Sequence, residues 1–275
     1  MISIVITNYK KLKLLLDCIR SVEEACRNLE YEIIISDSEK QAEAEKEIRK
    51  NFPDVRYLGF EKNIGFTRVV NEGLKKAKGD YIFVINSDIR VKSDAIKKLK
   101  DYIDKNPKIG LLGPKILTPD GGSSLSPRRF YKFPLTVLAR RTPFGNTGWG
   151  RKIKDYHLMK DYGRKEPRRV DWILGEALFT KKEHINKVGI LDERFFLYFS
   201  DVDWCFRFWK KRLEVVYYPE AVVEEMEEAG EITKARGRGI FSVFTSRLTK
   251  IHISEYIKFL LKYFGRKNPR KKYNA

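Results

Sequence analysis

Short apolar runs alternate with helix-patterned segments over the first third of this chain, and the alternation limits the folds open to it. An uninterrupted apolar run of about five residues is typical of a strand buried in a parallel sheet. Apolar residues that recur every three or four positions indicate amphipathic helices instead. Together they predict right-handed crossovers and a parallel sheet, so we expect an α/β fold. The expected strands are 2–6, 32–36, 55–58 and 81–85, and the expected helices lie near 12–22, 40–51 and 66–77.

Polar residues follow three of the expected strands, at the edge of the sheet where ligands of open α/β proteins bind. Asp88 could hold a hard divalent cation through oxygen while the cation holds a diphosphate, or it could cap a helix or turn. Asp37 could accept hydrogen bonds from a base or ribose, or cap the next helix. We expect a nucleotide at this edge. The polar groups are Thr7, Asn8 and Tyr9, then Asp37 and Ser38, then Asn86, Ser87 and Asp88.

The segment NIGFTRVVNEG at 63–73 allows a close approach of backbone to a ligand. Gly65 would give that approach, and Asn63 and Arg68 would supply hydrogen-bond donors. A simple turn entering a helix explains the same residues. The segment holds neither GxGxxG nor GxxxxGK[ST], which argues against a dinucleotide fold and a P-loop.

Carboxylates lie among bulky apolar residues in FFLYFSDVDWCFRFWKK at 195–211. Such surroundings can raise the pKa of a carboxyl towards values useful to a general base. Asp201 and Asp203 also suit the first turn of a helix capped by Ser200, and both interpretations can hold together. Arg207 lies four residues after Asp203, so it could pair with that residue or bind an anionic ligand.

The chain has 275 residues and a formal net charge of +19, which favours an anionic partner. A nucleic-acid binder would explain the charge, but not carboxylates gathered at strand ends, so we expect no nucleic-acid partner. The sequence has no apolar run of membrane-spanning length and no secretory signal pattern at its start, which predicts a cytoplasmic protein. Its cysteines, Cys18, Cys26 and Cys205, form no CxxC pair, and we expect them reduced and buried.

A basic amphipathic segment ends the chain. Its residues suit either peripheral contact with an anionic membrane surface or a helix packed on the core with a basic tail. Lys250, Lys258 and Lys262 are expected to lie away from its apolar face. The apolar face comprises Ile253, Tyr256, Ile257, Leu260, Leu261 and Phe264, and the basic tail comprises Arg266, Lys267, Arg270, Lys271 and Lys272.

The motifs, taken in order, resemble glycosyltransferase family 2 and, within it, the bacterial and archaeal rhamnosyltransferase-like branch. The resemblance covers residues 3 to about 225. It rests on SIVITNYK, EIIISD, NIGFTRVVNEG, GDYIFVINSD, RRFYKFP, VDWILGEALF, FFLYFSDVDWCFR and VVYYPEAVV.

This resemblance implies a GT-A fold, with a mostly parallel central sheet flanked by helices, and an inverting transfer of sugar to a hydroxyl acceptor. The donor would be a UDP-, GDP- or dTDP-sugar, with Mg²⁺ or Mn²⁺ as cofactor, and the acceptor a glycan or a lipid-linked precursor. We expect a nucleotide-sugar-binding half at 1–115, an acceptor-binding and catalytic half at 116–235, and the basic helix and tail at 236–275.

The resemblance also implies roles for individual residues. Asp201 would deprotonate the acceptor hydroxyl, supported by Asp203 and Arg207. Asp88 would bind the metal. The nucleotide would contact Thr7, Tyr9, Asp37, Asn63, Arg68, Asn86 and Ser87, and the sugar and acceptor would contact Trp172, Gly175 and Glu176.

Three positions depart from the family pattern. The family usually has two acidic residues before this helix, and here they are Ser200 and Asp201, so the first carboxylate is missing. The turn after Asp37 lacks the Asn and the Ser/Thr-rich residues that the family favours. Glu225 stands where the family often has a metal-binding His, so it would be a second metal ligand or part of a solvated acidic run. The alternatives to a transferase are a non-catalytic sugar-nucleotide-binding relative and a nucleotidyltransferase.

Overall fold

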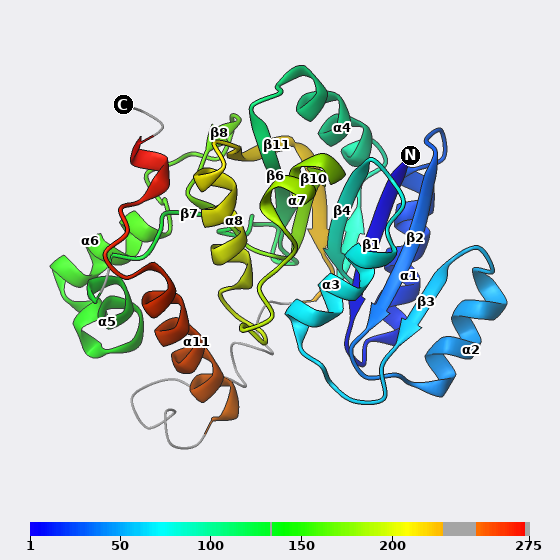
Figure 1. Cartoon of the computed structure of the whole chain (residues 1–275), viewed down its shortest axis with the longest axis horizontal. Coiled ribbons are helices and arrows are strands. Elements are labelled where there is room, and N and C mark those ends of the chain that lie inside the picture. Colours follow the sequence, from blue (N-terminus) through cyan, green and yellow to red (C-terminus); the bar gives the residue numbers. More distant parts are fainter. Residues whose placement is uncertain (133, 228–245, 273–275) are drawn as a thin grey trace.

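The computed structural model describes residues 1–132, 134–227 and 246–272, and it has a mixed sheet flanked by helices (Figure 1). Among these described residues the main sheet has nine strands in the order β3-β2-β1-β4-β10-β6-β11-β5, with β8 paired to β11. Its first four strands are β1 (Ile2–Asn8), β2 (Tyr31–Asp37), β3 (Arg56–Gly59) and β4 (Tyr81–Asn86). The helices between them are α1 (Leu12–Ala25), α2 (Ala42–Asn51) and α3 (Phe66–Lys76).

These four strands pair in parallel, which confirms the prediction from the alternating pattern. Every residue of β1 is buried, as expected for a central strand whose apolar run lacks polar alternation. The register places Asn8 opposite Asp37 and Thr7 opposite Asn86. The predicted polar strand ends therefore meet at one edge of the sheet.

The chain after β4 completes the sheet with strands that the sequence analysis did not place. Strand β10 pairs antiparallel to β4, and β11 runs parallel to β6 with a register shift between Tyr218 and Val222. Beyond that shift β11 reaches β5, where Glu225 lies opposite Ile89. The strands are β5 (Ile89–Val91), β6 (Ile109–Leu117), β8 (Arg168–Arg169), β10 (Ala177–Lys181) and β11 (Glu214–Glu225), with β7 (Pro127–Arg128) and β9 (Trp172–Ile173) in a second small sheet.

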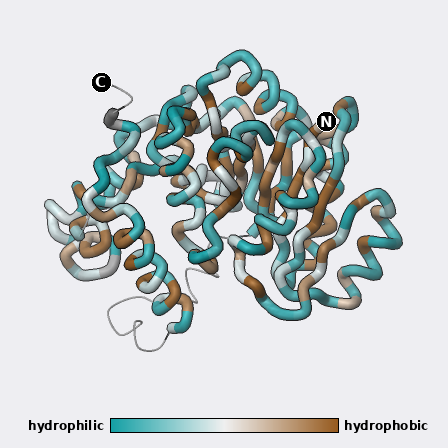
Figure 2. Tube along the Cα trace, viewed as in Figure 1, coloured by the Kyte–Doolittle hydropathy of each residue, from teal (hydrophilic) through white to brown (hydrophobic). Residues whose placement is uncertain are grey.

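Helices cover both faces of the main sheet, and the strands carry the most hydrophobic stretches of the trace (Figure 2). Leu15 of α1 and Leu99 of α4 pack in one core cluster with Ile4, whereas α3 contributes Val70 to the opposite cluster with Val5. The remaining helical segments are α4 (Ala95–Lys105), α5 (Leu135–Arg141), η1 (Pro143–Asn146), α6 (Gly148–His157), α7 (Lys182–Val188), α8 (Ser200–Lys210), α11 (Arg247–Tyr263) and η2 (Pro269–Lys272).

Helix α11 packs on the core beside α8, which was one of the two alternatives for the C-terminal segment. Its buried face differs from the predicted one, because Phe259 and Tyr263 join Tyr256 inside while Leu261 and Phe264 are exposed. The aromatic rings of Phe206 and Tyr263 lie 3.9 Å apart between their centroids. Residues 236–245 of the predicted C-terminal segment, and 273–275 of the tail, lie outside the described residues.

The three cysteines are buried and free, as predicted. Among the helices in the described part of the chain, none combines the length and the apolar character needed to span a bilayer.

Candidate active site

A cavity of about 640 Å³ opens where the sheet edge meets the start of α8. Its strand-end wall includes Lys11, Asn86, Asp88, Glu225 and Glu227, and its helix-side wall includes Arg128, Tyr131, Arg140, Trp172 and residues 197–202.

Residues 175 and 176 bridge the two walls through their backbone. The Gly175 N–H donates to Asp201 Oδ2 at 3.1 Å, and the Glu176 carbonyl accepts the Asn86 N–H at 3.1 Å. Asp88 and Asp201 therefore face one cavity although they lie 113 positions apart in the sequence. The predicted site residues that line it are Asn86, Asp88, Trp172, Gly175, Glu176, Asp201 and Glu225.

Carboxylates gather at the strand-end wall around one ammonium group. Lys11 Nζ donates to Asp88 Oδ2 at 3.0 Å and also contacts a carboxylate oxygen of Glu227. Burial raises the pKa of Glu225 to about 7, and the negative charge of Asp88 adds to the effect. Glu225 is therefore part of the cavity, whereas its neighbour Glu224 pairs with Lys92 at 2.6 Å. The alternative that the acidic run at the end of β11 is solvated surface is therefore wrong for Glu225.

The strand-end wall fits a hard divalent cation by the chemistry of its donors. Asp88, Glu225 and Glu227 offer oxygen, which Mg²⁺ and Mn²⁺ prefer. Burial raises the pKa of Glu225, and the negative charge of Asp88 adds a repulsion that a cation would offset. Within the described residues, however, no three His, Cys, Asp or Glu side chains already stand in metal-binding geometry. Lys11 stands among these carboxylates and supplies positive charge itself.

Asp201 lies in the first turn of α8 and is held by two backbone N–H groups. Its Oδ1 accepts from Val202 at 2.8 Å and its Oδ2 from Gly175 at 3.1 Å. Burial raises the pKa of Asp201, although these hydrogen bonds oppose the shift. The residue at the helix N-cap is Phe199, in a left-handed conformation with φ of 61°, so the prediction that Ser200 caps the helix was wrong by one residue.

Glu176 lies between the two walls with an unused oxygen. Burial raises its pKa to about 8, and the negative charge of Glu225 adds to the effect. Its Oε2 is buried and accepts no hydrogen bond from the described part of the protein. A carboxyl in this state is largely neutral at pH 7 and can donate a hydrogen bond to a ligand hydroxyl.

Several predicted nucleotide contacts are already used within the protein. Asp37 is fully buried, and its Oδ2 accepts hydrogen bonds from Asn8 Nδ2 and Tyr57 Oη, each at 3.0 Å. Asn63 Oδ1 accepts from Ser38 Oγ and from the Gly65 N–H, both at 2.9 Å. These contacts hold the loops after β2 and β3.

Glycine is required at position 65, because its φ is +85° and an added Cβ would lie 2.6 Å from the Phe196 carbonyl oxygen. The 63–67 loop therefore abuts the loop that precedes Asp201. Of the other predicted contacts, Thr7 Oγ1 donates to Asn86 Oδ1 at 3.0 Å. Tyr9 is exposed, and the exposed Arg68 pairs with Glu193 at 3.4 Å. None of the residues Thr7, Tyr9, Asp37, Asn63, Arg68 and Ser87 lines the cavity.

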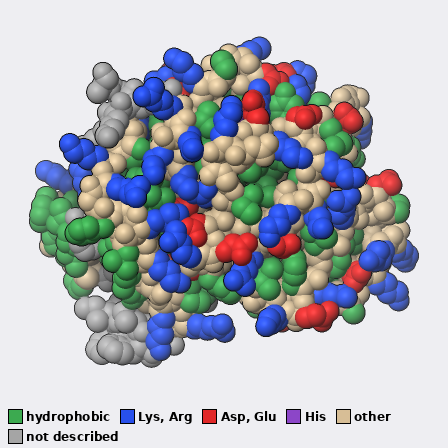
Figure 3. Space-filling model, viewed as in Figure 1, with side chains coloured by type: hydrophobic (Ala, Val, Ile, Leu, Met, Phe, Trp, Pro, Cys, Tyr) green, Lys and Arg blue, Asp and Glu red, His purple; other side chains and the backbone are tan. Residues whose placement is uncertain are grey.

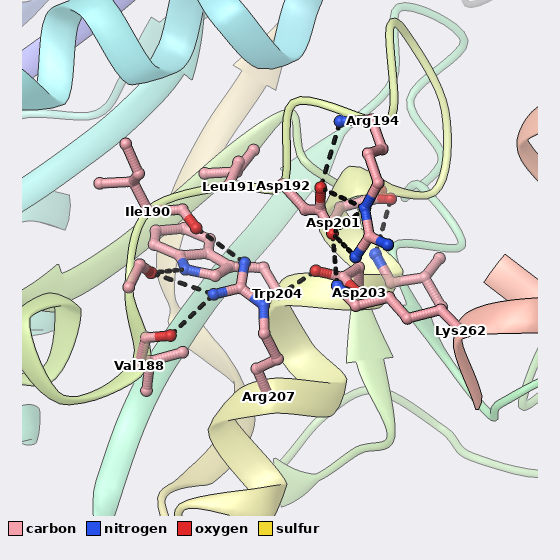
Figure 4. Close-up of polar contacts among 12 residues, drawn as sticks. Val188, Ile190, Leu191, Asp192, Arg194, Asp201, Asp203, Trp204, Arg207 and Lys262 are labelled. Carbon is pink, nitrogen blue, oxygen red and sulfur yellow. Dashed lines mark hydrogen bonds and ion pairs between the residues drawn. The ribbon is translucent and has the colours of Figure 1, made fainter. Parts of the chain in front are cut away.

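Asp203 and Arg207 lie in a buried ion-pair network instead of on the cavity wall (Figure 4). The Arg207 Nε donates to Asp203 Oδ2 at 2.8 Å, which confirms the predicted i,i+4 pair. Arg207 also donates to the carbonyls of Val188 and Ile190, and Lys262 contacts both Asp203 and Asp192.

This position corrects two expectations. Asp203 and Arg207 were expected in the acceptor pocket, but their polar groups are satisfied by α11 and by the loop after α7. Lys262 was expected to lie away from the packed face of its helix, but it lies inside the same network.

Sequence reasoning did not assign a site role to Lys11, Arg128, Tyr131, Arg140, Glu227 or His252, which also line the cavity. Arg128 and Tyr131 lie within the RRFYKFP motif, and Lys11 follows SIVITNYK directly, so both motifs carried a usable signal. Arg140 and His252 lie in helices whose pattern is amphipathic without any site motif.

The sheet, with its carboxylates at strand ends and at the start of α8, defines a GT-A-type fold. The chain belongs to glycosyl transferase family 2, whose model matches residues 3–168. Its relatives include the N-acetylglucosaminyl-diphospho-decaprenol L-rhamnosyltransferase of Mycobacterium tuberculosis, 28% identical over 63% of this chain and 59% of that protein. They also include the rhamnosyltransferase WbbL of Escherichia coli, 25% identical over 69% of this chain and 70% of that protein. These relatives confirm the rhamnosyltransferase-like branch.

Among solved structures, a mannosyltransferase from Pyrobaculum calidifontis in complex with GDP-Man and Mn²⁺ has a TM-score of 0.59. It is 11% identical, and the match covers 99% of this chain and 67% of that one. At this identity the likeness concerns the fold, which agrees with the predicted GT-A type.

Proposed function

We propose that this protein is an inverting glycosyltransferase that moves a sugar from a nucleotide-sugar donor to a hydroxyl acceptor. The observation that supports it most is the single cavity shared by Asp88 and Asp201, with residues 175 and 176 joining its walls. A transferase needs a charge-neutralising site for the leaving diphosphate within reach of a base for the acceptor. Opposite ends of one cavity supply that arrangement.

The donor would bind at the strand-end wall, in the half of the chain proposed as 1–115. The nucleoside would lie near Thr7, Tyr9 and the loops that Asp37 and Asn63 hold, with Arg68, Asn86 and Ser87 near the base or phosphates. Asp88 and Glu225 would hold a divalent cation, Mg²⁺ or Mn²⁺. A bound cation supplies charge neutralisation on the departing nucleoside diphosphate. Lys11 would offer a second positive charge at the same place.

Asp201 would be the general base. Its carboxylate takes the proton of the acceptor hydroxyl while the acceptor oxygen forms a bond to the anomeric carbon. The bond from that carbon to the diphosphate oxygen breaks, and its electron pair leaves with the nucleoside diphosphate. Attack from the face opposite the leaving group inverts the anomeric configuration. The raised pKa of Asp201 makes it a better proton acceptor than an exposed aspartate, provided it stays ionised.

Residues 172–176 would hold the transferred sugar. Trp172 is buried with one face near Arg128, and the neutral carboxyl of Glu176 would donate to a sugar hydroxyl. The acceptor would enter between α5, α8 and α11, in the half proposed as 116–235. The mycobacterial relative is named for a diphospho-decaprenol acceptor, and a lipid-linked or glycan acceptor is our proposal here. Contact of the 236–275 segment with an anionic membrane remains part of that proposal.

A thermal-shift panel of UDP-, GDP- and dTDP-sugars, with and without Mn²⁺, tests the donor half of the proposal. We expect one base and sugar to raise the melting temperature in a metal-dependent way, since ligand at about 100 times its Kd stabilises by about 2.7 kcal/mol. The matching donor should then release its nucleoside diphosphate when acceptor is added. A shift without any release would favour a non-catalytic binder, and release of pyrophosphate would favour a nucleotidyltransferase.

A further inference from the structure

Two arginines on the helix-side wall lack a carboxylate partner. Arg128 ends β7 and Arg140 lies in α5, and both line the cavity. Arg128 Nε donates to the Leu125 carbonyl at 3.0 Å, and Arg140 Nη1 donates to Tyr131 Oη at 3.2 Å. Within 1–132, 134–227 and 246–272, neither guanidinium forms an ion pair. Each guanidinium has five N–H donors, and most of these therefore remain available to a ligand in the cavity.

The next residue in the chain, Arg129, differs from Arg128 because its guanidinium is paired with a carboxylate. Arg129 binds Asp161 with two hydrogen bonds, at 2.9 and 2.7 Å. Arg128 instead lies over the Trp172 ring, with its Cζ 5.3 Å from the ring centroid. Burial lowers the pKa of Arg128 to about 10, and the positive charge of Arg140 contributes further. The two positive charges repel each other, and a bound anion would offset that repulsion.

The position of this pair within the cavity favours the acceptor over the donor. Asp88, Glu225 and Lys11 mark the opposite wall, where the donor diphosphate is proposed to bind. The carboxylates that act on Arg128 are Glu176 and Asp201, so its guanidinium lies near the proposed base. An anion held here would belong to the molecule whose hydroxyl faces Asp201.

The surface near this wall suits an apolar carrier. Figure 1 places α5, α6 and α11 at the same end of the molecule, and Figure 3 shows hydrophobic and basic side chains gathered there. The exposed fractions are 43% for Leu138, 60% for Trp149 and 73% for Leu261. Exposed apolar groups beside Lys and Arg match an amphiphile with an anionic head.

We propose that Arg128 and Arg140 form a subsite for the phosphate or diphosphate that links the acceptor sugar to an apolar carrier. The planar guanidinium fork can bind a phosphate through two parallel hydrogen bonds, which a lysine cannot do. The inference rests on the proposed function, because it assumes that the acceptor hydroxyl lies at Asp201. It adds the chemical class of the acceptor and the residues that select it.

Calorimetric titration of farnesyl diphosphate tests the subsite without turnover. The full chain is first saturated with Mn²⁺ and the nucleoside diphosphate that the donor panel identifies, so that the strand-end wall is filled. The variants are Arg128→Gln, Arg140→Gln and the double variant, with Arg129→Gln as the matched control. Farnesol and glucuronic acid serve as the neutral and carboxylate probes.

We expect wild type and Arg129→Gln to bind farnesyl diphosphate alike and the double variant to bind it at least about tenfold more weakly. Unchanged binding in the double variant would overturn the inference, as would equal loss in Arg129→Gln. Farnesol binding as tightly as its diphosphate would also overturn it. Displacement of the diphosphate by glucuronic acid at equal concentration would assign the site to sugar carboxylates instead. Release of nucleoside diphosphate by wild type reports the proposed function separately, so the two failures are distinguishable.

Discussion

The strand-end wall of the cavity is made of loops that follow parallel strands, whereas the helix-side wall depends on a helix start held by a second helix far along the chain. Backbone register alone brings Thr7 opposite Asn86 and Asn8 opposite Asp37. On the other wall, side chains of α11 do the positioning. The first arrangement follows from local pattern and sheet topology, and the second exists only in the folded molecule.

Helix α11 holds the chain on both sides of Asp201. The Glu255 carboxylate accepts the backbone N–H groups of residues 196–198, with 2.6 Å to that of Tyr198. About two turns further along α11, Tyr263 Oη donates to Asp203 Oδ1 at 2.6 Å. The position of Asp201 thus depends on contacts that span about sixty residues of chain, and the predictions below test that dependence against the strand-end wall, which the sheet positions.

The largest expected effect concerns Asp201, the proposed base. Asp201→Asn keeps the shape of the side chain but removes the proton acceptor, and its single amide oxygen can accept only one of the two backbone N–H groups. The transfer rate should fall by about 10² to 10⁴. Steady-state rates with the matched donor and acceptor measure it. Asp54→Asn, on the exposed surface, should leave the rate unchanged. A loss below threefold in Asp201→Asn would assign the base elsewhere.

Removal of charge from the network behind Asp201 should cost stability. Asp203 is fully buried between Arg207, Lys262 and Tyr263, and breaking a buried pair typically costs about 3–5 kcal/mol. Arg207 keeps its carbonyl partners, so we expect Asp203→Asn to lower the free energy of unfolding by about 3 kcal/mol. Urea denaturation measures this. Asp101→Asn, which breaks an exposed pair with Lys97, should change it by under about 0.5 kcal/mol.

Acid should loosen the helix-side wall through Asp192. Burial alone would raise its pKa, but hydrogen bonds from Arg194 and Lys262 outweigh burial and hold the pKa well below the usual 3.8. A depressed pKa contributes stability that is present above about pH 4 and is lost as pH falls below it. In wild type the free energy of unfolding should therefore fall more steeply between pH 4 and 2 than in Asp192→Asn. Parallel slopes in the two proteins would contradict this assignment.

The smallest effect is expected on the outer face of α11. Leu261 is 73% exposed, so Leu261→Ser should change the free energy of unfolding by at most about 0.5 kcal/mol. Phe259 is buried on the same helix, and Phe259→Ala should cost about 3–5 kcal/mol. Thermal and urea unfolding of the two variants measure the difference in stability between the buried and the exposed face of α11. Similar losses in both variants would mean that the exposed face is covered in solution.

The contrast between the walls also explains what could be predicted from the sequence. The four parallel strands and the convergence of Asp37 with Asn86 follow from apolar periodicity, which is local. A site role for Lys11 was not predicted from the sequence, because its partners Asp88 and Glu227 lie 77 and 216 positions away. The buried face of α11 was predicted partly wrongly, since Lys262 enters the core only because Asp192 and Asp203 are there to receive it.

Glu225 shows a related limit of pattern reasoning. An acidic run at the end of a strand is compatible with solvent exposure, and only the pairing of β11 with β5 brings Glu225 to the cavity beside Asp88. The Asp201 assignment rested on resemblance, and the structure adds the Gly175 hydrogen bond that links it to the other wall.

The most direct test distinguishes the roles proposed for the two walls. It measures donor affinity calorimetrically in Asp88→Asn and in Asp201→Asn, with Mn²⁺ and the matched nucleotide-sugar. Both variants should lose turnover. The account predicts that donor affinity drops at least about tenfold in Asp88→Asn and stays within about twofold of wild type in Asp201→Asn. Full donor affinity in Asp88→Asn together with lost affinity in Asp201→Asn would contradict it.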